Sequence, residues 1–213
     1  MKKFTLFACA MLFIITVQAQ EVKDYKPTGS EWNAEVNFDP FSSSPINISY
    51  IRLRKFMSES SALRLGVSIA GESDKPDENI KRSTFTINLR PGYEHHFTGT
   101  DRISPYVGAE LDFALKSTKE EDTSNDATLT GAYASGAERG FTRIGLNALL
   151  GVDFYVVKNL YLGTEIGFGF EIINEADIEI DPDPVNQNPL DEGGSSFQFG
   201  PNFNSSLRLG FIF

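Results

Sequence analysis

The thirteen residues LYLGTEIGFGFEI, Leu160–Ile172, decide the fold of this chain. Apart from one threonine, their even positions carry apolar side chains, whereas the odd positions carry Tyr161, Glu165, Glu171 and three glycines. A period of two places these two sets on opposite faces of a β-strand, while an amphipathic helix would need a period of 3.6. The stretch therefore predicts a strand with one apolar face and one polar face.

The same alternation recurs along most of the chain. It is present in seven segments, near residues 32–38, 63–69, 85–93, 103–115, 144–156, 160–172 and 197–213. Most of these segments have the length that a tilted strand needs to cross a hydrocarbon layer. We therefore predict an all-β protein.

An eighth segment, Ile46–Phe56, changes phase along its length. Ile48 and Ile51 fall in opposite phases, and a one-residue β-bulge near Ser49–Tyr50 would bring both onto one face. With this segment the strands number eight, and bacterial outer-membrane barrels have even numbers of antiparallel strands.

The predicted connections differ systematically in length. They fall near residues 39–45, 57–61, 72–82, 98–102, 117–139, 157–159 and 174–196. After the first, which is intermediate, short and long connections alternate. Outer-membrane barrels have short periplasmic turns and longer outer loops, so this order predicts an eight-stranded up-and-down transmembrane barrel.

Composition excludes two classes of protein. The chain has 213 residues, a formal net charge of −10 and a mean hydropathy of −0.22. No run of about 18 apolar residues follows residue 20, which excludes a helical membrane protein. The acidic balance argues against a nucleic-acid partner, because phosphate would be repelled. The 18 phenylalanines are many for an acidic soluble domain, and we expect many of them to face lipid.

The polar face distinguishes a membrane barrel from a secreted soluble barrel or sandwich whose apolar face points inward. This face carries seven carboxylates and six arginines: Glu35, Glu94, Glu110, Asp112, Asp153, Glu165, Glu171, Arg52, Arg54, Arg64, Arg90, Arg143 and Arg208. Near-equal numbers are expected where the groups pair inside a narrow barrel, since an unpaired buried charge is costly. Arginine suits this role because its planar fork bridges several carboxylates. We therefore predict an interior charge network that fills the barrel and excludes a constitutive pore.

The first residues have the pattern of a secretory signal peptide. Lys2 and Lys3 precede an apolar stretch, Phe4–Val17, and Ala19 is a small residue at the predicted cleavage point. Cleavage would remove two lysines and the single cysteine, giving a net charge of −12 and no disulfide. We predict a signal peptide at 1–19, a flexible periplasmic lead-in at 20–30 and a barrel at 31–213.

Four stretches carry a family resemblance: Asn88–Tyr93, Ser104–Glu110, Gly151–Gly167 and Ser206–Phe213. They resemble the small outer-membrane β-barrel proteins of the Bacteroidota, which are similar to the membrane domain of OmpA and to opacity-type porins. The resemblance implies location in the outer membrane of a Gram-negative bacterium, in contact with its lipid and lipopolysaccharide. It also implies that the barrel-assembly machinery reads the C-terminal aromatic residues, here Phe211 and Phe213.

Other residues offer weaker candidates for chemistry. His95 and His96 are adjacent, so they point to opposite faces of a strand, and no nucleophile motif accompanies the lipid-facing His95. The loop at 174–196 holds seven acids and no basic residue: Glu175, Asp177, Glu179, Asp181, Asp183, Asp191 and Glu192. They could bind Ca²⁺ or Mg²⁺, although a solvated surface loop explains them as well. We predict no cofactor, catalytic residue or metal ligand.

The function that these observations favour is non-enzymatic. We expect a structural or interaction protein that displays acidic extracellular loops, or an accessory subunit that contacts other outer-membrane or surface proteins. The alternatives are a narrow or gated channel, in which the charge network rearranges, and a lipid-modifying outer-membrane hydrolase.

Overall fold

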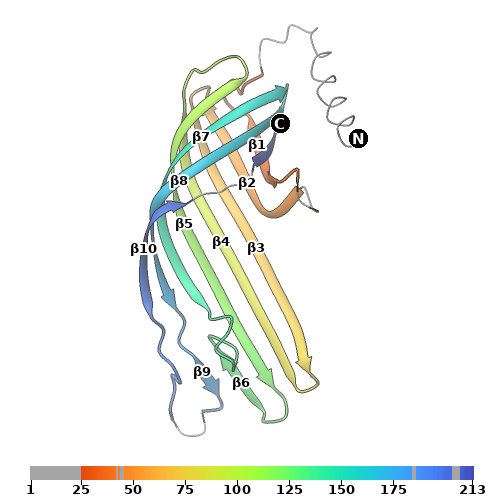
Figure 1. Ribbon diagram of the computed structural model, residues 1–213, viewed down its shortest axis with the longest axis vertical. Coiled ribbons are helices and arrows are strands. Elements are labelled where there is room, and N and C mark those ends of the chain that lie inside the picture. The colour runs from red at the N-terminus through yellow and green to blue at the C-terminus, as the bar shows by residue number, and fades with distance from the viewer. Residues whose placement is uncertain (1–24, 42, 44–45, 184–185, 203–206) are drawn as a thin grey trace, which may run out of the picture.

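The structure is a computed structural model that describes residues 25–41, 43, 46–183, 186–202 and 207–213. It is a closed, antiparallel β-barrel of eight strands, which confirms the predicted fold class (Figure 1). None of the described segments forms a helix long and apolar enough to span a membrane. The predicted signal peptide lies outside the described residues and stays a prediction.

Seven wall strands are continuous and the eighth has two parts. The bounds are β1 (Trp32–Phe38), β2 (Ile46–Ser58), β3 (Ser61–Asp77), β4 (Ile80–His96), β5 (Ile103–Asp122), β7 (Phe141–Val157), β8 (Leu160–Glu175), and β10 (Ser195–Asn202) with β11 (Leu207–Ile212). Each wall strand pairs with its sequence neighbour, and β11 pairs with β1 to close the barrel. Two short strands, β6 (Ala127–Thr130) and β9 (Glu179–Asp181), extend the sheet beyond the wall.

The barrel has two distinct ends. At the turn end, the connections β2–β3, β4–β5 and β7–β8 are short, and the C-terminal strand ends there (Figure 1). At the loop end, β3, β4, β5, β7 and β8 extend far beyond the short β1–β2 hairpin (Figure 1). Short connections at the turn end therefore alternate with long extensions at the loop end, as the sequence predicted.

The segments predicted as long loops contain more β-strand than predicted. Residues 72–82 were expected as a loop, but β3 and β4 continue and leave only a tight turn at 78–79. The expected loop 117–139 holds the end of β5 and all of β6, and the expected loop 174–196 holds β9. The backbone hydrogen bonds between strands continue into segments that lack apolar alternation. Paired strands of Ser, Thr, Lys and Glu can be exposed to water on both faces, so they need no apolar face.

The predicted irregularity in the second strand is present but larger than predicted. Val36 of β1 faces Ile51 of β2, while the next residue, Asn37, faces Asn47. Three extra residues of β2 therefore bulge between these pairs, where one was predicted. The extra residues include Ser49 and Tyr50, the positions inferred from the phase change.

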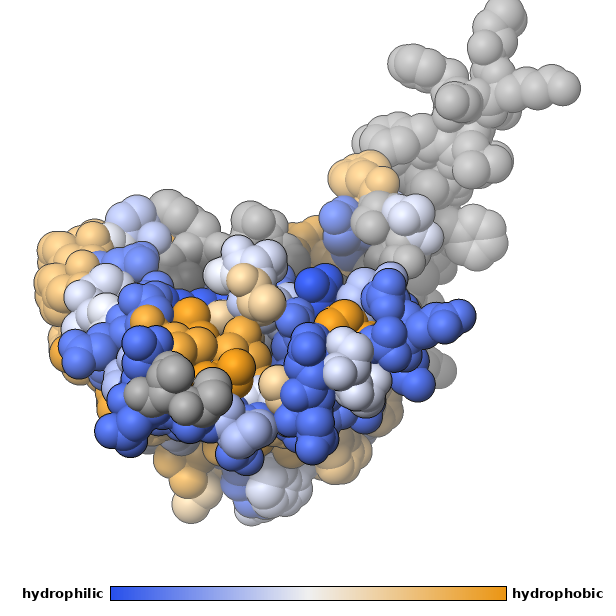
Figure 2. Space-filling model, turned by 90° about the horizontal axis from the view of Figure 1, so that it is seen from below, coloured by the Kyte–Doolittle hydropathy of each residue, from blue (hydrophilic) through white to orange (hydrophobic). Residues whose placement is uncertain are grey.

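The apolar phase of the strands points outward, which excludes the soluble barrel with an apolar interior. Leu150, Ile166 and Phe168 are 53%, 48% and 49% exposed, and similar residues surround the wall. At the loop end the surface is mainly hydrophilic, with hydrophobic residues at its sides and in a patch between (Figure 2). An apolar outer belt with polar ends is the surface expected of a membrane-spanning barrel.

Candidate functional site: the charged barrel interior

The structure places the predicted charge network inside the barrel, in two layers. Ten of the thirteen residues are at most 6% exposed: Glu35, Arg52, Arg54, Arg64, Glu94, Glu110, Asp112, Asp153, Glu165 and Arg208. The other three, Arg90, Arg143 and Glu171, have side chains 22–26% exposed and lie closer to the loop end. Strand alternation positions all of them, because each occupies the inward phase of its strand.

Arg54 is the centre of the deeper layer. Its Nη1 lies 2.9 Å from Glu94 and 2.8 Å from Asp153, and its Nη2 donates to the hydroxyl of Tyr161 at 2.6 Å. Its Nη2 also pairs with Glu35. One guanidinium thus connects β2 to four other strands, β1, β4, β7 and β8, across the barrel.

Two further arginines of the deep layer share carboxylates. Arg64 lies 2.9 Å from both Glu94 and Glu110, and it donates to Glu165 at 2.7 and 3.1 Å. Arg52 binds Glu165 at 3.1 Å. Because Glu94 and Glu165 each pair with more than one arginine, and Glu110 joins them through Arg64, the layer is a connected network.

Sequence reasoning missed the buried tyrosines that complete this layer. Tyr106 donates to Glu165 at 2.5 Å, and Tyr161 donates to Glu35 at 2.7 Å. A β-carbon at Gly151 would overlap the Tyr106 ring, and one at Gly210 would overlap Tyr161. In each case an inward-facing tyrosine lies opposite a glycine on the neighbouring strand, and the glycine makes room for the ring. That pairing of residue types is the sequence signal that could have identified the tyrosines.

Apolar residues and residues 25–30 close the barrel at its turn end. Tyr155, Tyr161 and Ile212 form a buried cluster, against which Tyr25 packs. Arg102 donates to the Tyr25 hydroxyl at 2.9 Å and lies over its ring. Residues 25–30, predicted to belong to a flexible lead-in, therefore make defined contacts across this end of the barrel.

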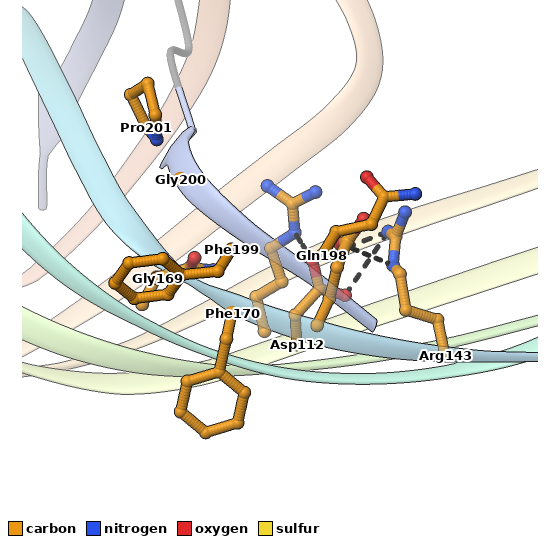
Figure 3. Close-up of a pocket in the computed structure, with 11 residues that line it drawn as sticks. Asp112, Arg143, Gly169, Phe170, Gln198, Phe199, Gly200 and Pro201 are labelled. Carbon is orange, nitrogen blue, oxygen red and sulfur yellow. Dashed lines mark hydrogen bonds and ion pairs between the residues drawn. The ribbon is translucent and has the colours of Figure 1, made fainter. Parts of the chain in front are cut away.

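The outer layer consists of Arg90, Asp112, Arg143 and Glu171, and these four residues line a cavity of about 450 Å³. Arg90 and Arg143 both pair with Asp112, at 3.1 and 3.4 Å, and Arg143 lies 3.6 Å from Glu171. Figure 3 shows Arg143 and Asp112 on one side of this cavity, with Gln198 beside them and Gly200 and Pro201 farther along β10. The lining also includes Asn147 and Phe199, and the residues of the deep layer are not among the described residues that line it.

The two histidines face opposite sides of the wall, as their adjacency predicted. His95 is exposed and its ring contacts Phe97 at 5.3 Å. His96 is 3% exposed and bonds to Glu94 and Ser104 inside the barrel. The inward histidine is thus part of the charged interior, which sequence reasoning did not anticipate.

A basic residue outside the acidic 174–196 segment pairs with that segment. Arg139 lies 2.5 Å from Asp191 and 3.6 Å from Glu175, and it donates to the carbonyl of Ala176 at 3.0 Å. Among the described residues, no three acidic or histidine side chains gather closely enough to hold a metal ion. In the same region Asp122 caps the β5–β6 hairpin, and hydrogen bonds from Ser124 and Asn125 lower the pKa of its carboxyl.

The two C-terminal aromatic residues lie on the outer surface. Phe211 and Phe213 are 52% and 64% exposed. The backbone of Phe213 exchanges two hydrogen bonds with Trp32, at 2.8 and 3.0 Å. Phe211 and Phe213 are therefore accessible at the turn end, as recognition by another protein would require.

Comparison with known proteins supports the same class. Residues 75–170 match the model of an OmpA-OmpF-like porin family, a span that runs from the end of β3 into β8. A comparison with curated proteins finds no match to the chain. The family match and the eight-stranded barrel together fit an OmpA-like barrel, and they point to a protein of the outer membrane.

Proposed function

We propose that this protein is an outer-membrane β-barrel that serves as a structural or interaction protein and does not conduct solutes. The observation that carries the proposal is the deep layer of the interior. Arg52, Arg54, Arg64 and Arg208 meet five carboxylates there, and these nine side chains are buried. The barrel lumen of eight strands is only wide enough for side chains, so this layer leaves no continuous water path.

The loop end is the part of the molecule suited to contact partners. It extends well beyond the apolar belt, since β5 alone has 20 residues and about 11 suffice for a tilted crossing. Its surface carries Glu72, Asp74, Asp77 and Glu78 at the β3–β4 tip, all exposed. A rigid sheet extension with acidic tips is a suitable display surface for other outer-membrane or surface proteins and for cation-bridged lipopolysaccharide.

The second candidate is a gated channel, and the outer cavity is the observation that favours it. This cavity is lined by Arg90, Asp112 and Arg143 of the outer layer, so a conducting path would still require the deep layer to rearrange. Breaking several buried ion pairs at once is costly, which disfavours this candidate in the resting protein.

Proteoliposome swelling tests the proposal. Vesicles that contain the refolded protein should swell in isotonic arabinose no faster than empty vesicles. A matched variant, R52A/R64A, removes two arginines from the deep layer and serves as the opened control if it folds. Swelling by the wild-type protein at the rate of a known porin would refute the proposal.

A further inference from the structure

A second cavity lies at the turn end of the barrel, separate from the outer layer. Its volume is about 350 Å³, and it is lined by residues 26–28, the β2–β3 turn, residues 96–101 and Ser104. Two of its lining residues, His96 and Ser104, are only 3% and 4% exposed. The role proposed above for the barrel makes no use of this cavity.

Ser104, His96 and Glu94 form a hydrogen-bonded chain beside the cavity. The Oγ of Ser104 lies 3.0 Å from Nδ1 of His96, and Nε2 of the same ring lies 3.1 Å from Oε2 of Glu94. The imidazole packs between the rings of Phe56 and Tyr106, with centroids 5.1 and 5.0 Å away. Packing on both sides therefore fixes the orientation of the imidazole.

The surrounding charges determine which nitrogen of His96 carries the proton. Glu94 pairs with Arg54 and Arg64, each at 2.9 Å, and these guanidinium groups hold it as a carboxylate. A carboxylate only accepts hydrogen bonds, so Nε2 of His96 must donate to it. In the neutral ring, Nδ1 is then an acceptor, and the hydroxyl of Ser104 donates to it.

We propose that Ser104 is a nucleophile that attacks small carboxylic esters entering from the turn end. His96 acts as its general base, and Glu94 is a positioning residue that orients the ring. A nucleophile, a base within hydrogen-bond reach and a third group that orients the base are the three parts that serine acyl transfer requires.

The proposed reaction is balanced without any cofactor. The Oγ of Ser104 bonds to the ester carbonyl carbon while its proton moves to Nδ1 of His96. The bond from that carbon to the alkoxy oxygen then breaks, and the leaving alkoxide takes the proton from His96. Water attacks the acyl-serine by the same route, which releases the carboxylic acid and restores the hydroxyl.

The cavity lining indicates the class of substrate. Lys26 lines it, and its Nζ donates to the carbonyl of Thr98 at 2.7 Å. Glu59 and Asp101 also line the cavity, and we assign to Lys26 the stabilisation of the carbonyl oxygen as it becomes negative in the tetrahedral intermediate. A volume of about 350 Å³ lies at the small end of the range for ligand pockets, so we infer short-chain esters and exclude whole lipids.

A fluorophosphonate probe tests the proposal on the full-length protein refolded in detergent. We expect one covalent adduct, located by mass spectrometry on the peptide that contains Ser104. Hydrolysis of p-nitrophenyl acetate should fall about 100-fold in S104A and in H96Q. The matched control is S124A, because Ser124 is an exposed serine in the β5–β6 turn at the opposite end of the barrel, where its hydroxyl donates to Asp122.

The control should label and hydrolyse as the wild-type protein does. Absence of any adduct on folded protein, or equal labelling of S104A, would show that the Ser104–His96 bond only satisfies buried polar groups. A retained barrel in each variant is checked by its faster migration on gels without boiling. Neither outcome bears on solute conduction, so this test and that of the proposed function can fail separately.

Discussion

Arg208 and Glu35 lie 173 positions apart in the sequence, yet their side chains form an ion pair of 2.9 Å inside the barrel. Arg208 belongs to β11 and Glu35 to β1, the strands whose pairing closes the barrel. The same carboxylate accepts from Arg52 at 3.0 Å. The junction between β1 and β11 is therefore held by backbone hydrogen bonds in the wall and by the shared Glu35 carboxylate in the interior.

We expect E35Q to destabilise the barrel strongly. The substitution keeps the shape of the side chain but leaves buried guanidinium groups without their shared charge, which costs about 3–5 kcal/mol in the free energy of unfolding. Urea titration in detergent, followed by the fluorescence of the single tryptophan Trp32, measures the change. In E138Q, whose parent carboxylate is 52% exposed, the free energy should change by less than about 0.5 kcal/mol. Equal midpoints for E35Q and the wild type would contradict the network's role.

We expect G151V to destabilise the barrel by displacing Tyr106. A side chain at position 151 would occupy the volume of the Tyr106 ring, and overpacking of this kind costs about 1–3 kcal/mol. The same urea titration measures it. Gly200 provides the control, because a β-carbon there would have no neighbour within 4 Å, and G200A should leave the midpoint unchanged. A wild-type midpoint for G151V would mean that Tyr106 can leave its site at little cost.

We expect R139A to loosen the acidic segment at the loop end without affecting the wall. Arg139 pairs with Asp191 and Glu175, and losing an exposed pair of this kind lowers local stability by about 1 kcal/mol. Limited proteolysis should then cleave residues 174–194 about fivefold faster. The control K158A alters a turn at the opposite end and should not change the cleavage rate. Unchanged proteolysis of R139A would show that backbone pairing alone holds the segment.

We expect F213A to impair assembly in cells more than stability in detergent. The resemblance to outer-membrane barrels implies recognition of the C-terminal aromatic residues, and Phe213 is exposed. The measurement is the fraction of heat-modifiable protein in outer-membrane preparations. F97A removes another exposed aromatic residue near the turn end and serves as the control. Equal assembly of F213A and F97A would contradict a specific role for Phe213.

Strand phase was the part of this structure that the sequence predicted best. Alternation identified seven wall strands, and a phase change explained by a bulge added the eighth. The same pattern gave the inward position of residues as far apart as Glu35 and Arg208, because the side-chain period of a strand is two. The outward direction of the apolar phase followed from the balance of acids and arginines on the other phase. These inferences depend only on local pattern and on the cost of unpaired buried charge.

The alternation of apolar and polar residues could not predict which charged side chains pair in the interior. Nor could it predict that the strands extend into polar segments. Which carboxylate Arg54 meets depends on strand register and tilt, which alternation does not specify. The extension of β3 to Asp77 has no apolar face, so its sequence is indistinguishable from that of a loop. The contact between His96 and Ser104 was missed because it joins neighbouring strands diagonally, and the register pairs His96 with Tyr106 instead.

Single-channel recording in a planar bilayer tests the central claim most directly, namely that ion-paired side chains fill the barrel. The refolded wild-type protein, inserted at defined density and held at moderate voltage in 1 M KCl, should give no steady conductance step. Stable, voltage-independent steps from the purified wild-type barrel would contradict the claim, because they require a continuous water path through the layer that joins Arg52, Arg54, Arg64 and Arg208 to their carboxylates.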